Sequence, residues 1–108
     1  MEKGNFFESG AIPSKGNECF DQIFQGSAIK IERIISNAHS DDSDNWYDQE
    51  ADEWVMLVSG DAQLLFEGEA VISLKAGDYL FIPAHKKHKV LTTSAEPPCY
   101  WLAIHGRF

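Results

Sequence analysis

The sequence has little cysteine and no long apolar run, and both shortages exclude classes of protein. Its 108 residues include two cysteines, Cys19 and Cys99, far apart in the chain. Domains held by disulfides or structural zinc usually carry several closely spaced cysteines, so we expect both thiols to stay reduced. No stretch approaches the roughly 18 to 20 apolar residues of a membrane span, and residues 1–10 lack the apolar segment of a signal peptide. We therefore expect a cytoplasmic protein that does not enter a membrane.

Positive charge is also scarce. The chain has 9 Lys and Arg against 17 Asp and Glu, a formal net charge of −8, and residues 34–74 contain neither Lys nor Arg. Nucleic-acid binding depends on clustered basic side chains, so nucleic acid is not expected as a partner, whereas a small-molecule ligand is. The length and the 44% hydrophobic content suit a single globular domain.

A long amphipathic helical pattern is missing as well, and short strand patterns separated by turn residues take its place. The expected strands are 27–36, 53–59, 62–66, 70–74, 79–82, 88–93 and 100–105. This spacing predicts an all-β sandwich or barrel. Residues 1–26 have no sustained period, so we expect an N-terminal arm that packs on a single barrel domain formed by residues 27–108.

Two segments carry a more specific pattern. Glu53 is followed by six residues and then Gly60, while Gly77 is followed by five residues and then Pro83, with His88 shortly after. The two glycines fall where chain reversals favour a positive φ, and a proline ends a strand by removing a ladder donor. Glu53 and His88 would then open two strands and point into one interior.

These segments resemble the two motifs of the cupin superfamily, and the resemblance covers roughly residues 29–104. It implies a small single-domain cupin with an antiparallel β-barrel, also described as a double-stranded β-helix or jelly roll. Small barrels of this kind expose strand edges, so a homodimer is expected.

The same resemblance implies a metal site, but with a changed ligand set. Metal-binding cupins carry two histidines in the first motif; counted back from Glu53, these positions hold Tyr47 and Gln49 or, with a longer gap, Trp46 and Asp48. The remaining donors are Gln49, Glu53 and His88, or Asp48 in place of Gln49. Mostly oxygen donors with one imidazole suit Mn²⁺, Fe²⁺ or Zn²⁺. A hydrogen-bonded Glu–His pair in a metal-free pocket is the alternative.

The loop 37–52 is acidic and carries two aromatic residues. Trp46, Tyr47 and Asp48 are candidates for ligand contacts, because an irregular loop offers its aromatics little to pack against except the pocket mouth. Its carboxylates, including Asp42 and Asp44, would repel anionic ligands. The basic segment 85–89 either forms surface ion pairs or steers a ligand. His39 and His105 are interpreted as surface or strand-end residues rather than ligands, and the side on which His105 lies in the last strand is left open.

Three functions remain open from these residues. The first is a metal-dependent small-molecule enzyme, in which Tyr47 positions the substrate; the resemblance leaves oxygenase, isomerase and lyase chemistry equally open. The second is a metal-free ligand-binding or regulatory protein, which the missing histidines favour. The third is a structural interaction module, which predicts exposed aromatics and an interior without polar side chains.

Overall fold

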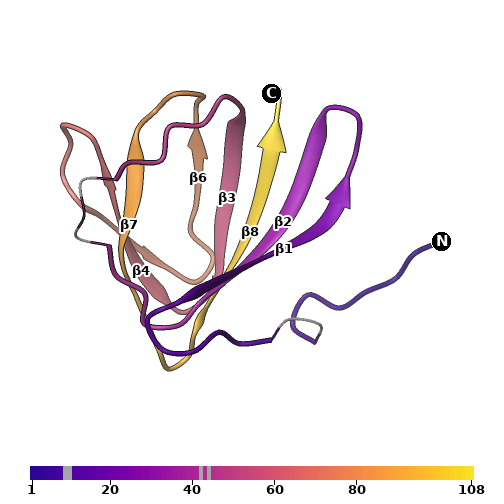
Figure 1. Cartoon of the computed structure of the whole chain (residues 1–108), viewed down its shortest axis with the longest axis horizontal. Coiled ribbons are helices and arrows are strands. Elements are labelled where there is room, and N and C mark those ends of the chain that lie inside the picture. The colour runs from indigo at the N-terminus through magenta and orange to yellow at the C-terminus, as the bar shows by residue number, and fades with distance from the viewer. Residues whose placement is uncertain (9–10, 42, 44) are drawn as a thin grey trace.

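The computed structural model describes residues 1–8, 11–41, 43 and 45–108, and the regular structure in these ranges is all β-strand. Figure 1 shows the arrangement of its eight strands. They are β1 (Glu18–Gln25), β2 (Ile29–Ser36), β3 (Asp52–Ser59), β4 (Asp61–Phe66), β5 (Ile72–Lys75), β6 (Tyr79–Ile82), β7 (His88–Thr93) and β8 (Cys99–Gly106). None of the described segments forms a helix that is long and apolar enough to cross a membrane.

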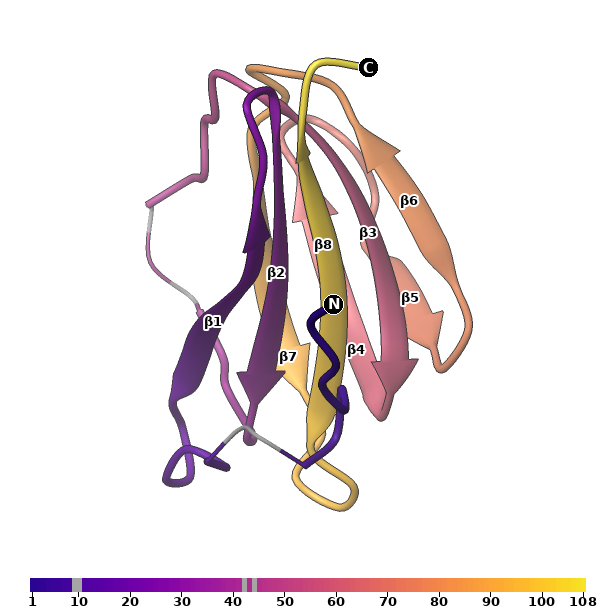
Figure 2. The same ribbon diagram turned by 90° about the vertical axis from the view of Figure 1, so that its right-hand side faces the viewer.

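The strands form two antiparallel sheets that face each other, as Figures 1 and 2 show. The larger sheet has the order β1-β2-β8-β3-β6, and the smaller one has the order β5-β4-β7. This confirms the all-β antiparallel prediction and agrees with a jelly roll. The closed barrel is not confirmed. Beside β7 runs the loop between β2 and β3, and within the described residues the two meet only in isolated bridges, at Ser40–Thr92 and Tyr47–His88, rather than in a continuous strand ladder.

The strand predictions agree closely with the structure, apart from β1. The ranges 79–82 and 88–93 are reproduced as predicted, and the other expected strands differ at their ends by at most two residues. Residues 18–25, expected in an irregular arm, form β1 and pair with β2. A register shift between Gln22 and Phe24 breaks the two-residue alternation that would have revealed this strand.

The segment before β1 packs on the outer face of the larger sheet. The rings of Phe6 and Phe7 lie 6.3 and 5.3 Å from the ring of Tyr100, measured between centroids. The Arg33 guanidinium donates a hydrogen bond to the Phe6 carbonyl oxygen at 3.1 Å. The segment therefore covers the outer face of the larger sheet around Arg33 and Tyr100.

The core lies between the sheets, on the inward side of alternate residues. Leu57 pairs in register with Trp101 and Val55 with Ala103, so β3 and β8 present matching apolar rows. Gly60 ends β3 with φ of 91°, and a Cβ added there would lie 2.8 Å from the Cys99 sulfur. The motif glycine is thus required for its backbone conformation and for space, as expected.

Candidate functional site

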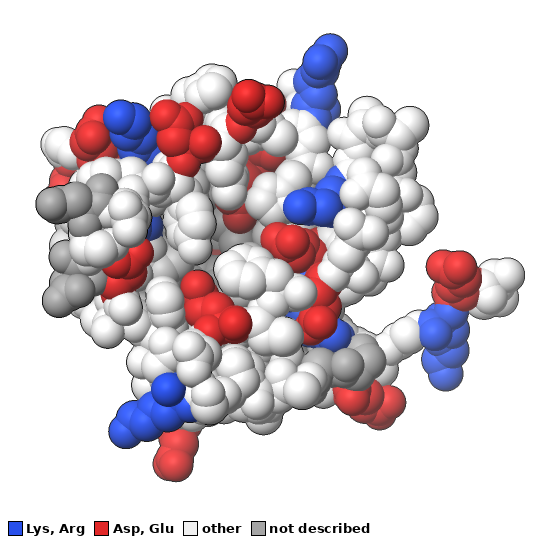
Figure 3. All heavy atoms as spheres, viewed as in Figure 1, with Lys and Arg blue, Asp and Glu red and all other residues white. Residues whose placement is uncertain are grey.

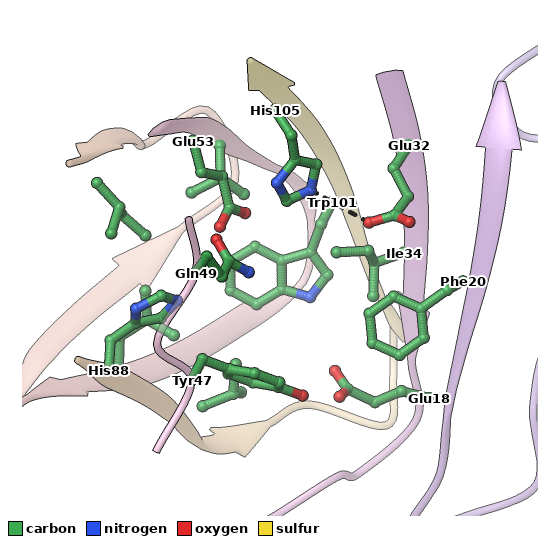
Figure 4. Close-up of a pocket in the computed structure, with 14 residues that line it drawn as sticks. Glu18, Phe20, Glu32, Ile34, Tyr47, Gln49, Glu53, His88, Trp101 and His105 are labelled. Carbon is green, nitrogen blue, oxygen red and sulfur yellow. Dashed lines mark hydrogen bonds and ion pairs between the residues drawn. The ribbon is translucent and has the colours of Figure 1, made fainter. Parts of the chain in front are cut away.

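A cavity of about 80 Å³ lies between the two sheets, around the start of β3 (Figure 4). Such a volume holds several water molecules or part of a small ligand. Half of its lining is apolar, namely Phe20, Ile34, Val55, Leu64, Ile82, Val90 and Trp101. The polar half is Glu18, Glu32, Tyr47, Gln49, Glu53, His88 and His105. A cleft that combines apolar walls with convergent polar groups is a common form of a small-molecule site.

Glu53 occupies the inward position that precedes Val55 and Leu57 on β3, and its side chain is only 6% exposed. Burial raises the pKa of Glu53 above its ordinary value, because the charged form loses hydration. His105, His88 and a hydrogen bond to the Gln49 side chain oppose this rise. The carboxyl group therefore sits in surroundings that favour taking up a proton.

His88 begins β7 with 5% exposure and has a fixed orientation. Its Nδ1 lies 2.8 Å from the Lys86 carbonyl oxygen, which can only accept, so Nδ1 is the donor in this contact and Nε2 is left for other partners. The ring lies between Tyr47 and Phe66, with centroid separations of 5.7 and 5.6 Å. The Tyr47 amide donates to the His88 carbonyl at 2.8 Å. These contacts hold the His88 ring in one orientation.

Two cavity residues, His105 and Glu32, were missed by sequence reasoning. His105 was interpreted as a surface or strand-end residue, yet it faces the cavity, with its Nε2 3.3 Å from Glu32 Oε1. It pairs in register with Glu53. Alternation along β8 from the buried Trp101 and Ala103 leads to His105 and could have identified it.

Glu18 and Phe20 were missed because their segment was not expected to be a strand. They alternate along β1 and both point into the cavity (Figure 4). Ser36 Oγ donates to Glu18 Oε2 at 2.6 Å and accepts from Trp101 Nε1 at 3.1 Å. His39 Nε2 lies 3.5 Å from the other carboxylate oxygen of Glu18. These contacts fix both the carboxylate and the indole.

Of the three predicted ligand-contact residues, the structure places one at the cavity. Tyr47 lines it, and burial together with the Glu18 carboxylate raises the pKa of the Tyr47 hydroxyl. Asp48 instead accepts a hydrogen bond at the surface from His85, with 2.8 Å between Oδ1 and Nδ1. The Trp46 ring lies beneath the ammonium group of Lys89, 4.7 Å from the ring centroid. Trp46 and Asp48 are therefore outside the described lining.

Three residues of the basic segment 85–89 have partners of their own. In the basic segment, Lys86 forms an ion pair with Glu69. With His85 on Asp48 and Lys89 over Trp46, this favours a surface ion-pair belt over ligand steering. In the acidic loop, Asp42 and Asp44 lie outside the described residues.

The predicted metal ligands Gln49, Glu53 and His88 do line one cavity, but they do not fit a metal ion as a set. Gln49 is hydrogen-bonded to the Glu53 carboxyl group. Within the described ranges, no three His, Cys, Asp or Glu side chains lie close enough together to hold a metal ion. The predicted set supplies one imidazole, one carboxylate and one amide, whereas catalytic zinc sites usually have three imidazole, carboxylate or thiolate ligands.

The comparisons with known proteins agree with this fold and site. Residues 37–105 match the sequence profile of the family described as Cupin domain. The chain belongs to the cupin family. No curated protein matches it.

Among solved structures, a protein from Ralstonia eutropha JMP134 is 38% identical, with a TM-score of 0.90 and 100% of both chains covered. Its assignment as a mannose-6-phosphate isomerase is provisional. A cupin superfamily protein from Desulfitobacterium hafniense DCB-2 is 18% identical, with a TM-score of 0.74 and 100% and 94% of the chains covered. The polyketide cyclase RemF from Streptomyces resistomycificus is 13% identical, with a TM-score of 0.77 and 98% and 79% covered. The last two likenesses establish the fold alone.

Proposed function

We propose that this cupin binds a small organic molecule between its sheets and moves a proton on it, without using a metal ion. The observation that carries the proposal is Glu53, a buried carboxyl group whose pKa is raised by burial and which faces the cavity. The His88 ring lines the same cavity, with its Nδ1 held by the Lys86 carbonyl oxygen. A proton donor and a proton acceptor held in one cavity are the parts that general acid–base catalysis requires.

An isomerase or lyase fits these parts better than an oxygenase. Moving a proton between neighbouring atoms of a substrate needs only an acid and a base, which Glu53 and His88 supply. The isomerase assignment of the Ralstonia eutropha protein supports the same class, although that assignment is provisional. Ligand binding without catalysis is the second candidate, and the missing first-motif histidines favour it.

A phosphorylated substrate does not suit this cavity. Its described lining contains Glu18, Glu32 and Glu53 but no Lys or Arg. A phosphate dianion would meet three carboxyl groups and no fixed cation, so repulsion and lost hydration would both oppose its binding. We therefore propose a substrate without a phosphate group.

Deuterium uptake from D₂O into substrate carbon tests the proposal. Mannose, fructose, glucosamine and mannose-6-phosphate are incubated with the protein and followed by NMR. We expect exchange into an unphosphorylated sugar, and we expect Glu53→Gln to slow it about 100-fold or more. Glu67→Gln is the matched control, because it removes a carboxylate from an exposed turn. Exchange only into mannose-6-phosphate, or an unaffected Glu53→Gln variant, contradicts the proposal, and no exchange at all favours binding without catalysis.

The proposal that no metal ion takes part is tested by thermal melting and elemental analysis. A metal that binds the folded state alone would raise the melting temperature. We expect Mn²⁺, Fe²⁺ and Zn²⁺ to leave it unchanged and protein purified without chelator to contain no stoichiometric metal. A rise that disappears in His88→Ala would instead establish the metal site implied by the family resemblance.

A further inference from the structure

We propose that the ligand of this cavity is a small organic cation, with its ammonium group held between Glu18 and the rings of Phe20, Tyr47 and Trp101. The inference rests on the proposed function only in taking this cavity as the binding site. It adds the chemical class of the ligand and assigns the end of the cavity away from Glu53 to ligand recognition.

The charge of the cavity is the first observation. Among its described lining residues, three carboxyl groups face two histidines, and no Lys or Arg takes part. Glu32 has His105 as its partner at 3.3 Å. Figure 3 shows acidic side chains around the hollow on this face. Carboxylates in an apolar-walled cleft concentrate the field, so the cleft attracts cations.

The fixed position of Glu18 is the second observation. Ser36 donates to one of its oxygens at 2.6 Å, while His39 lies 3.5 Å from the other. His39 is partly exposed, does not line the cavity, and approaches Glu18 from the loop after β2. Only the hydrogen bond from Ser36 is short, so Glu18 retains accepting capacity toward the cavity. Its charge is thus held in place and available to a ligand.

The aromatic residues around Glu18 are the third observation. In Figure 4 its carboxylate lies between the ring of Phe20 and the hydroxyl end of Tyr47, with the Trp101 indole beside them. The indole N–H is already used in its 3.1 Å bond to Ser36, so the ring offers the cavity its π surface. Aromatic faces around a carboxylate are the surroundings that bind ammonium groups.

The exposure of these rings gives the direction of binding. Phe20 is 54% exposed and Tyr47 is 44% exposed, so both stand at the mouth, whereas Glu53 and His88 are buried. The ammonium group would stay at the mouth and the reacting end of the ligand would reach inward. At the mouth, a cationic group would keep part of its hydration shell. Contacts with the carboxylate and with the aromatic faces would replace the water molecules that it loses.

A titration with choline and with its uncharged isostere, in which carbon replaces nitrogen, tests the proposal at constant ionic strength. Both probes have the same shape, so a difference in affinity reports the charge. We expect choline to shift the NMR signals of Phe20 and Tyr47 and to bind about tenfold more tightly than the isostere. Glu18→Gln keeps an acceptor for Ser36, and it should weaken choline binding about tenfold while leaving the isostere unchanged. Phe20→Leu, at a half-exposed position, should weaken choline binding severalfold, and Glu67→Gln should change nothing.

Equal affinity for the two probes would contradict the proposal that the ligand is a cation. Choline binding that is unchanged in both Glu18→Gln and Phe20→Leu would contradict it as well. Failure of choline to bind at all would do the same. The deuterium exchange test and its dependence on Glu53 are decided separately, so either proposal can fail while the other stands.

Discussion

The interior of this protein has an apolar part and a polar part, built from the same two strands. On β3 and β8 the inward pair Leu57 and Trp101 lies in the core, and the inward pair Glu53 and His105 lies at the cavity. Leu57 is 0% exposed and Glu53 is 6% exposed, so both side chains are buried. Burial at similar depth therefore has different consequences for an apolar and for an ionisable side chain.

The physical difference lies in what each side chain loses on leaving water. Leu57 loses unfavourable hydration and gains close packing, so its burial stabilises the fold. Glu53 loses favourable hydration of its charge, which appears as the raised pKa of its carboxyl group. The cavity is thus the part of the interior where burial of a charged group lowers stability.

Leu57→Ala should give the largest effect among the variants that test this contrast. It removes a fully buried side chain from the apolar part, and we expect a loss of about 2 to 5 kcal/mol in the free energy of unfolding. Denaturant unfolding followed by circular dichroism measures the loss. A loss below about 1 kcal/mol would mean that this part of the interior is not closely packed.

Glu53→Gln should act in the opposite direction. A carboxyl group whose pKa is raised in the folded state binds its proton more tightly there, so its contribution to stability falls as pH rises from about 4.5 through the raised pKa. At neutral pH the variant, which has no charge to bury, should be more stable than the wild type. Below pH 4.5 the advantage should disappear. A variant that is destabilised at neutral pH would show that the ionised Glu53 supports the fold.

The two thiols should show the smallest effect. Both cysteines are free, with Cys19 partly exposed on the edge strand β1 and Cys99 fully buried in the core. A thiol reagent should therefore modify Cys19 in the folded protein and reach Cys99 only after unfolding, with no change in the fold beforehand. Fast reaction of Cys99 in the folded state would show that the apolar part opens readily.

The sequence predicts the parts of the fold that are governed by local rules. Two-residue alternation and turn residues identify every strand except β1, and the motif containing Pro83 and His88 identifies the family. The bulge between Gln22 and Phe24 hides β1 because a register shift interrupts the alternation. Glu18 and Phe20 were not predicted as site residues because they belong to that strand.

Within the site, sequence reasoning reached Tyr47, Gln49, Glu53 and His88 but not their partners. His105 joins Glu53 through the register of β8 on β3, and register between distant strands depends on the packing of the whole sheet. Asp48 was assigned to the pocket from its place in the loop, yet a hydrogen bond to His85 holds it at the surface. The contacts of these residues depend on long-range pairing, although alternation along β8 indicates the side on which His105 lies.

The titration of Glu53 itself tests the central claim most directly. Carbon-13 NMR of the side-chain carboxyl carbon, assigned with Glu53→Gln, follows this group as the pH of the folded protein is changed. The account predicts a midpoint above the ordinary value of 4.5, because burial outweighs the attraction of His105 and His88. A midpoint at or below 4.5 would contradict it, because Glu53 would then be an ordinary buried ion-pair partner rather than the proton donor of the cavity.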